Sequence, residues 1–188
     1  NQLQKNIWIN IPVNANDAYV TQLAALLKST LDPNLIVYVE YSNEVWNGIF
    51  TQSKDNFNAA VAEVNAGGSP LNADGDTNPY YWGWRRVAER LKQISDLFAG
   101  VWGQSAINAR VRCVLAAQYA NPLVLQEGLE FIDRTYGAPS RFFYAAAEAP
   151  YIAMGSIDQT DPNMTSDEII SHLQGSATSN AQRYSTFE

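Results

Sequence analysis

The stretch LIVYVEYSNEVWN, residues 35–47, decides the fold class of this chain. Its first half is almost entirely apolar, which is typical of a strand covered on both faces in a parallel sheet. Its second half presents an amide, a carboxylate and an indole at Asn43, Glu44 and Trp46. In parallel α/β folds, functional side chains gather at the carboxyl ends of the strands. We therefore expect a functional site directly after this strand.

Strand and helix patterns alternate along the rest of the chain. Runs of strand-forming residues predict further strands at Asn6–Pro12, Ala109–Gln118 and Arg141–Tyr151. Apolar residues at helical spacing predict helices from Asp17 to Leu31, Thr51 to Val64, Tyr80 to Trp102, Leu123 to Tyr136, and after the capping-box sequence at Thr165–Glu168. We predict one α/β domain over 1–188, with the Gly, Asn and Asp-rich residues 65–79 as a loop insertion between two helices.

Four successive strand–helix units fit two architectures. One is an open sheet of the flavodoxin type, and the other is half of a (β/α)8 barrel. No glycine-rich dinucleotide motif and no Walker loop follows any of the strands, so phosphate-binding versions of the architecture are disfavoured. The residues at the strand ends have to decide between the two.

Composition excludes several classes of function. The formal net charge is -7 and the 12 Lys and Arg are scattered, which argues against a nucleic-acid partner. The single cysteine, Cys113, lies in an apolar run, so we expect a buried thiol rather than a disulfide, a metal ligand or a reactive group. No apolar run has the length of a membrane helix, and we expect neither a membrane partner, a metal nor a cofactor.

The pair Asn43-Glu44, with Glu40 four residues earlier, resembles the Asn-Glu pair of clan A glycoside hydrolases. That family has (β/α)8 barrels and carries the pair at the end of the fourth strand. The resemblance implies that the four strands here are the third to sixth of such a barrel. A longer segment, LDPNLIVYVEYSNEVWN, resembles bacterial secreted proteins described as cellulase-like or cellulose-binding.

The chemistry of retaining glycosidases suits these residues. It requires a carboxylic acid that protonates the leaving oxygen and a second carboxylate about 5 to 5.5 Å away as the nucleophile. The resemblance implies that Glu44 is the acid, and Glu148 is the candidate nucleophile within the chain, although it lies one strand earlier than the family's nucleophile. The expected substrate-binding residues are Asn43, Trp46, Asn47, Gln118 and Tyr151.

Structural roles remain open for the same residues. Glu44 could instead cap or salt-bridge the following helix, and Trp46 could belong to the core. For Trp82 and Trp84, packing of the long helix is favoured over the rim of a sugar cleft. His172 lies in the last helical pattern and is expected on a helix surface.

The resemblance implies a glycoside hydrolase-type domain that acts on a β-linked polysaccharide and is incomplete and inactive as this chain. The alternatives are a carbohydrate-binding protein on the same scaffold and an independent α/β interaction domain. Half a barrel would expose two strand edges, so we expect a homo-oligomer. The chain begins without Met, which leaves any export signal unread, and a secreted or periplasmic location is favoured for the full-length protein.

Overall fold

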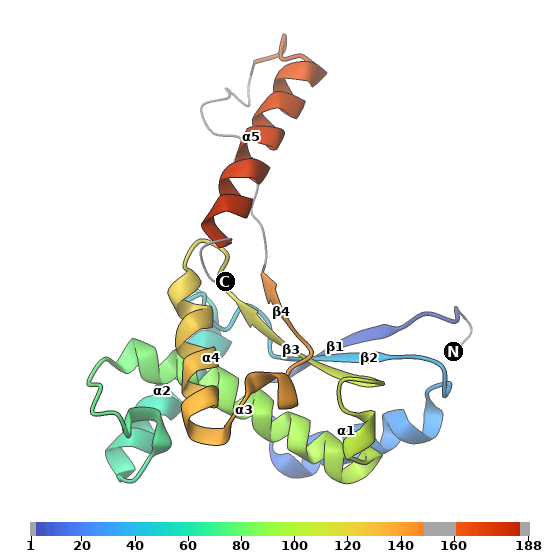
Figure 1. The fold of residues 1–188 in the computed structure, drawn as a ribbon, viewed down its shortest axis with the longest axis vertical. Helices are drawn as coiled ribbons and strands as arrows, with labels where there is room; N and C mark the ends of the chain where they lie inside the picture. The colour runs from blue at the N-terminus through green and yellow to red at the C-terminus, as the bar shows by residue number, and fades with distance from the viewer. Residues whose placement is uncertain (1–2, 149–160, 185–188) are drawn as a thin grey trace. The chain divides into compact units, whose positions relative to one another are not determined.

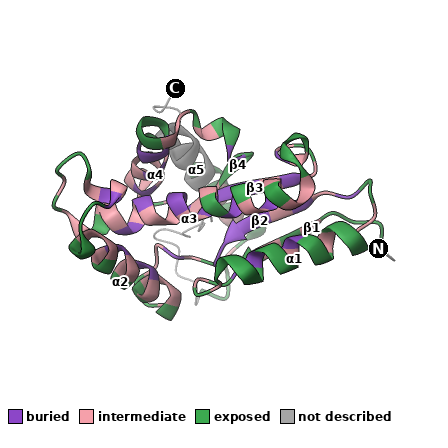
Figure 2. Cartoon of the chain, turned by 90° about the horizontal axis from the view of Figure 1, so that it is seen from below, coloured by how far each residue is buried: buried purple, intermediate pink, exposed green. Residues whose placement is uncertain are grey.

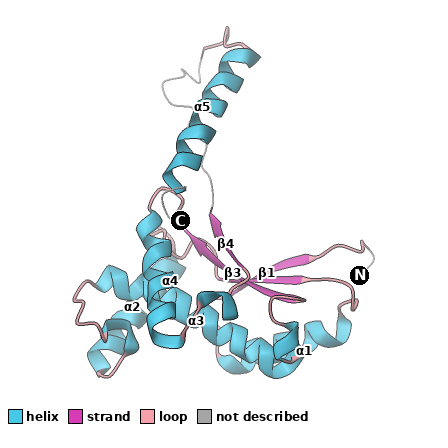
Figure 3. Ribbon diagram, in the orientation of Figure 1, coloured by secondary structure: helices cyan, strands magenta, loops and turns pink. Residues whose placement is uncertain are grey.

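A computed structural model describes residues 3–148 and 161–184 of the chain, which forms two compact units, Asn1–Glu148 and Ala149–Glu188 (Figure 1). Each unit is described by itself. In the first unit, strands alternate with helices along the chain (Figure 3). Its strands are β1 (Ile7–Ile11), β2 (Val37–Tyr41), β3 (Val111–Ala117) and β4 (Ala145–Glu148). Its helices are α1 (Asp17–Thr30), α2 (Thr51–Ala66), α3 (Pro79–Trp102) and α4 (Pro122–Tyr136).

The four strands form one parallel sheet in the order β1-β2-β3-β4, so neighbours in space are also neighbours in the chain. Helices α1, α3 and α4 lie against the same face of this sheet (Figures 1 and 2). The predicted mixed α/β class, with a parallel sheet built from strand–helix units, is confirmed.

The core lies between the sheet and these helices. In β2, Val37, Val39 and Tyr41 face the helices and are buried, while the intervening Tyr38 and Glu40 point to the opposite face. Apolar side chains of α3 meet them from the other side of the core, and the largest of these are Leu91, Ile94 and Phe98.

Cys113 belongs to the same buried layer, in register with Val39 of β2. Burial raises the pKa of the Cys113 thiol to about 12, so the group stays protonated and unreactive at neutral pH. The prediction of a buried thiol is confirmed.

The strand β2 ends earlier than its sequence pattern predicts. Alternation along the chain predicts that Ser42 and Glu44 continue the face of Tyr38 and Glu40. Instead, Ser42 has φ 60° and Glu44 has φ 46°, so the backbone enters the left-handed region directly after Tyr41. The strand therefore stops there, and the face assignment fails beyond that residue because a non-glycine residue at positive φ cannot continue the pleat.

The strand β4 begins later than the predicted run from Arg141. Pro139 opens a 3₁₀ turn, Pro139–Arg141, and the carbonyl of Pro139 accepts the N–H groups of Phe142 and Phe143 at 2.9 Å each. Both phenylalanines pack into the core, and pairing with β3 starts only where the Tyr144 N–H donates to the Cys113 carbonyl. The predicted end at Tyr151 lies outside the described residues.

The segment between α2 and α3, residues 67–78, is anchored rather than loose. It holds a 3₁₀ turn, Pro70–Asn72, capped by the Ser69 hydroxyl. Arg85 of α3 reaches back to this segment, where it donates to the Leu71 carbonyl at 2.8 Å and pairs with Asp74 at 3.0 Å. The Asp-Gly-Asp turn, whose aspartates are Asp74 and Asp76, is therefore the docking point of the loop on the long helix.

The second unit contains α5 (Ser166–Tyr184) among its described residues. The predicted capping box is present, because the Thr165 N–H donates to Glu168 Oε2 at 2.8 Å and the Glu168 N–H donates to the Thr165 hydroxyl at 3.3 Å. This hydrogen bonding lowers the pKa of Glu168. His172 is exposed on this helix, as the sequence predicts.

Candidate functional site

The Asn43-Glu44 segment forms a compact turn between β2 and α2. The Asn47 side-chain amide donates to Glu44 Oε2 at 3.1 Å, and the Asn47 N–H donates to the Glu44 carbonyl at 2.9 Å. The side-chain amide of Gln52, in the first turn of α2, donates to the Asn43 carbonyl at 2.9 Å. Asn43 itself is exposed and Glu44 is partly buried. Helix α2 therefore starts directly against this turn and holds it in place.

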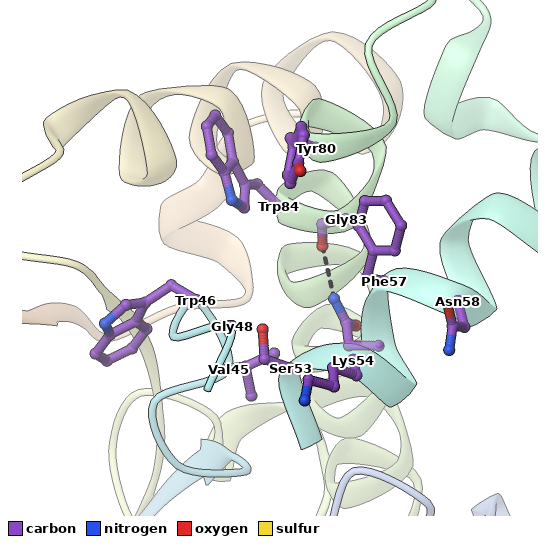
Figure 4. A pocket seen from close by; sticks show the side chains of 11 residues that line it. Val45, Trp46, Gly48, Ser53, Lys54, Phe57, Asn58, Tyr80, Gly83 and Trp84 are labelled. Carbon is purple, nitrogen blue, oxygen red and sulfur yellow. Dashed lines mark hydrogen bonds between the residues drawn. The ribbon is translucent and has the colours of Figure 1, made fainter. Parts of the chain in front are cut away.

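A pocket of about 440 Å³ opens beside this turn. Val45 and Trp46, the two residues after Glu44, form one wall, and the other walls come from the first turns of α2 and α3 (Figure 4). The aromatic lining consists of Trp46, Phe57, Tyr80 and Trp84. The polar lining consists of Ser53, Lys54, Asn56 and Asn58.

The two tryptophans of the sequence YYWGWRR have different roles. Trp84 lines the pocket, whereas Trp82 packs against the core and its indole N–H donates to the Asp76 carbonyl at 3.0 Å. The predicted packing of the long helix is confirmed for Trp82. Trp84 contacts Tyr81, with ring centroids 5.3 Å apart, and lines the pocket as well. Tyr80 lies one helical turn before Trp84 and contacts Phe57 of α2, with ring centroids 5.3 Å apart. The i, i+4 spacing of Tyr80 and Trp84 is the signal in the sequence that could have revealed this wall.

The back of the pocket is held by one buried amide. Asn56 is 3% exposed, and its side-chain amide donates to the Gly83 carbonyl at 2.8 Å, the dashed line in Figure 4. Its carbonyl oxygen accepts from Arg86 at 2.9 Å. Both ends of the amide are thus satisfied, so Asn56 joins α2 to α3 and keeps the two helices at a fixed separation. At Gly83, a Cβ atom would lie 3.6 Å from the Phe57 ring, which shows how closely the helices approach.

Glu40 lies on the sheet face opposite the helices. The Trp8 indole N–H donates to Glu40 Oε2 at 2.9 Å, and Trp8 also stacks on Tyr38 with ring centroids 5.4 Å apart. Burial raises the pKa of Glu40, while hydrogen bonds from Trp8 and Asn10 act in the opposite direction. Trp8 and Asn10 are thus the polar partners of this buried carboxyl group.

The same face carries a row of aromatic and cationic side chains. Trp8, Tyr38 and Arg112 occupy equivalent register positions on β1, β2 and β3. Arg112 donates to the Tyr38 hydroxyl at 2.9 Å, and its guanidinium lies 4.1 Å from the ring centroid of Tyr144. This row is polar and well ordered, unlike the aliphatic layer on the helix-covered face.

Glu148 ends β4 in register with Ala117 of β3. Strand alternation directs its side chain to the face of Ala117 and Leu115, which α4 covers, and away from the face of Glu40. Two strand spacings also separate β4 from β2, which amounts to about 10 Å between their backbones. The close approach of Glu148 to Glu44 that a retaining mechanism needs stays a prediction.

The remaining residues predicted to bind substrate that the structure describes lie near the carboxyl end of the sheet. Gln118 directly follows β3, and its carbonyl accepts from the Asn121 N–H at 3.1 Å in the turn that leads into α4. Asn47 is held against Glu44. Tyr151 lies outside the described residues. Of the predicted site residues, Trp46 alone is among the described residues that line the pocket.

Comparison of this chain with family models, with curated proteins and with solved structures finds no match. Within the described ranges, no group of three or more His, Cys, Asp or Glu side chains is placed to hold a metal ion. None of the helices described combines the length and the apolarity that a membrane span requires.

Proposed function

We propose that this chain is a glycoside hydrolase-type domain that binds a β-linked polysaccharide at the carboxyl end of its sheet. The observation that carries the proposal is the pocket beside the Asn43-Glu44 turn, whose lining combines Trp46 of that turn with aromatic residues of α2 and α3. Aromatic rings pack against the C–H faces of pyranose rings, and the nearby amides and hydroxyls suit sugar hydroxyls.

The arrangement of the sheet supports a barrel origin for the domain. A flavodoxin-type sheet changes direction in its strand order and has helices on both faces. Here the order is sequential and α1, α3 and α4 share one face, as in a (β/α)8 barrel. We propose that the four strands correspond to the third to sixth of such a barrel, with Glu40, Arg112 and Tyr38 on its inner side.

The aromatic wall suits a chain of sugars rather than a single ring. Tyr80 and Trp84 are four residues apart on α3, which separates them by about 6 Å along the helix axis. Trp46, in the turn after β2, adds a further aromatic residue to the lining. A pocket with apolar walls and a few placed polar groups is the common form of a ligand site.

Binding and turnover depend on different residues in this proposal. In the hydrolase, Glu44 would donate the proton to the leaving oxygen, and a second carboxylate would have to lie about 5 to 5.5 Å from it. The position of Glu148 on the helix-covered face favours a second candidate function, a non-catalytic carbohydrate-binding protein on the same scaffold. We expect little or no hydrolysis by the isolated chain in either case.

Calorimetric titration of the chain with a β-1,4-linked gluco-oligosaccharide of five or six units tests the proposal. We expect Trp46→Ala to weaken binding about five- to 150-fold, with the roughly 1–3 kcal/mol of a nucleobase stacked on an aromatic ring taken as the scale for a sugar ring. Tyr19→Ala, which removes an exposed aromatic residue of α1, is the matched control and should bind like the wild type.

Equal affinity of Trp46→Ala and the wild type would contradict the proposed pocket. An assay for the reducing ends that hydrolysis of an oligosaccharide releases separates the two candidate functions. The assay uses the protein extended by its flanking genomic sequence. Hydrolysis that disappears in Glu44→Gln supports the enzyme, whereas oligosaccharide binding without hydrolysis in the wild type supports the binding protein.

A further inference from the structure

The pocket differs in charge from the rest of the chain. The sequence has 19 Asp and Glu against 12 Lys and Arg, so an average surface of this protein is acidic. Yet the described lining of the pocket contains no carboxylate, and its one charged side chain is Lys54. A pocket whose lining contains a cation and no carboxylate attracts an anionic ligand, because the lining holds no negative charge that would repel it.

The carboxylates near the pocket are engaged elsewhere. Asp55, the next residue along α2, accepts from the Asn14 side-chain amide at 2.9 Å. Glu63 accepts from the Ser69 hydroxyl at 2.7 Å and lies 3.9 Å from Arg86. Among the residues that the structure describes, Lys54 forms no ion pair. Its ammonium group is therefore available to a ligand.

Lys54 also lies where a sugar substituent would reach it. It follows Ser53 in the first turn of α2, on the side of the pocket away from Trp84 and Tyr80 (Figure 4). Asn58 lies one helical turn further along α2 and also lines the pocket. A pyranose ring packed on the aromatic wall would present its exocyclic group toward this polar wall. The ammonium of Lys54 and the hydroxyl of Ser53, its neighbour in the sequence, can both donate to a carboxylate.

We infer that the pocket selects an acidic β-linked oligosaccharide, one in which the sugar stacked in the pocket is a uronic acid whose carboxylate pairs with Lys54. This inference rests on the proposed function and names the substrate class for the same site. The aromatic wall supplies affinity for the ring, and Lys54 supplies the preference for the uronate over the neutral sugar.

Two oligosaccharides that differ only at C6 test the inference. The probes are a β-1,4-linked gluco-oligosaccharide and the glucurono-oligosaccharide of equal length, each titrated calorimetrically into the full chain at low ionic strength. We expect the acidic probe to bind about two- to fivefold more tightly, the usual range for an exposed ion pair. The preference should shrink as salt is added, because screening weakens an exposed ion pair.

Three variants identify the group responsible. Lys54→Gln should abolish the preference by weakening the binding of the acidic probe, whereas Lys54→Arg should retain most of it. Lys5→Gln makes the same change of net charge at an exposed lysine outside the pocket lining and should keep the full preference.

Each outcome bears on one claim. Equal affinities for the two probes, or an undiminished preference in Lys54→Gln, would overturn the uronate inference and leave the proposed sugar site standing. Failure of both probes to bind the wild type would overturn the proposed function itself. A preference lost in Lys54→Gln and retained in Lys5→Gln establishes the inference.

Discussion

Arg85 joins parts of the fold that are distant from it in the sequence. Its guanidinium is 2% exposed and bonds to carboxylates from two segments, with Nη2 3.0 Å from Asp74 and 2.9 Å from Glu127. Asp74 is shared with Arg134 of α4, at 2.9 Å. The cluster therefore ties the 67–78 segment, α3 and α4 together, and this holds the first turn of α3 where it lines the pocket.

Replacement of Arg85 should be destabilising. Arg85→Met leaves the partly exposed Asp74 and Glu127 without this cation and the buried Leu71 carbonyl without its donor, and a buried group left unsatisfied typically costs about 1–3 kcal/mol of the free energy of unfolding. Urea unfolding followed by circular dichroism measures it. Arg134→Met is the matched control, because Arg134 pairs with the same Asp74 from a more exposed position and should cost less than about 1 kcal/mol. Similar losses in the two variants would contradict the role assigned to Arg85.

Glu89 is a buried carboxyl that makes stability depend on pH. It is 6% exposed on α3, and the Tyr136 hydroxyl donates to its Oε1. Burial raises the pKa of Glu89, which the hydrogen bond from Tyr136 opposes, and the neighbouring charges are Glu63, Arg86 and Lys92. The folded state therefore holds this proton more tightly than the unfolded chain does. Its contribution to stability is present at low pH and is lost as pH rises through the raised pKa.

Glu89→Gln should remove this dependence. We expect the variant to gain stability relative to the wild type as pH rises from about 4.3, the ordinary pKa of Glu, toward neutrality, because only the wild type then ionises a buried carboxyl. Urea unfolding of both proteins at a series of pH values between these limits measures the difference. A difference that stays constant with pH would show that Glu89 ionises in the folded state as it does in water.

At the scale of elements, α3 is the central helix of the helical layer. It contacts α1, α2 and α4, and its amphipathic pattern was clear in the sequence. The predicted helices agree with the structure to within one or two residues at most ends, and the side chain of Asn16 caps α1 by accepting from the Tyr19 N–H at 2.9 Å. Helix periodicity and caps are local properties, which is why they could be predicted from the sequence.

The contact between α3 and α4 is close because α4 has a glycine there. A Cβ atom at Gly128 would lie 3.2 Å from the Cβ of Ala88 and 3.6 Å from Cδ2 of Leu115. Small residues on both helices allow the helices to approach, and Leu115 then packs between them and the sheet. Trp84 is held on the same side of α3, next to this contact.

Two glycine substitutions test this packing. Gly128→Val should lower the free energy of unfolding by about 1–3 kcal/mol, the usual cost of overpacking a core. Gly100→Ala, in α3 where an added Cβ meets nothing within 4 Å, should raise it by about 0.5–1 kcal/mol through helix propensity alone. Thermal unfolding of the two variants gives the comparison, and a stable Gly128→Val protein would contradict the close approach.

At the scale of the whole molecule, the outer edges of the sheet are the surfaces through which we expect one copy of the chain to pair with another. In the first unit, β1 and β4 each pair with one neighbour, so each has an outer edge within this sheet. Edge strands present backbone N–H and C=O groups that can pair with another chain. Trp8 on β1 is 49% exposed, which adds apolar surface beside one of these edges.

We predict that the chain associates with itself through these edges. Sedimentation velocity at micromolar concentrations should show a dimer or a larger assembly that dissociates on dilution. Trp8→Lys should shift the equilibrium toward the monomer, because a charged side chain on an edge strand opposes pairing. A monodisperse monomer of the wild type across the concentration range would count against both the exposed edges and the half-barrel proposal.

The sequence by itself determined the strand–helix order, the caps and the buried apolar faces. These depend on residues within one or two turns of each other, where a period of 2 or 3.6 reports burial directly. It also indicated the segment beside which the pocket lies, because Asn43, Glu44 and Trp46 follow a buried strand. The short β4 was the local exception, since the turn opened by Pro139 competes with a strand-like run.

Only the tertiary structure decided what surrounds that segment. The strand order, the single helix-covered face and the pocket depend on contacts between distant parts of the chain, such as the Asn56–Gly83 hydrogen bond across 27 residues. The same is true of the role of Trp84 and of the cationic wall at Lys54. No local pattern encodes which helix faces meet, because the helices' relative placement follows from side-chain packing over the whole unit.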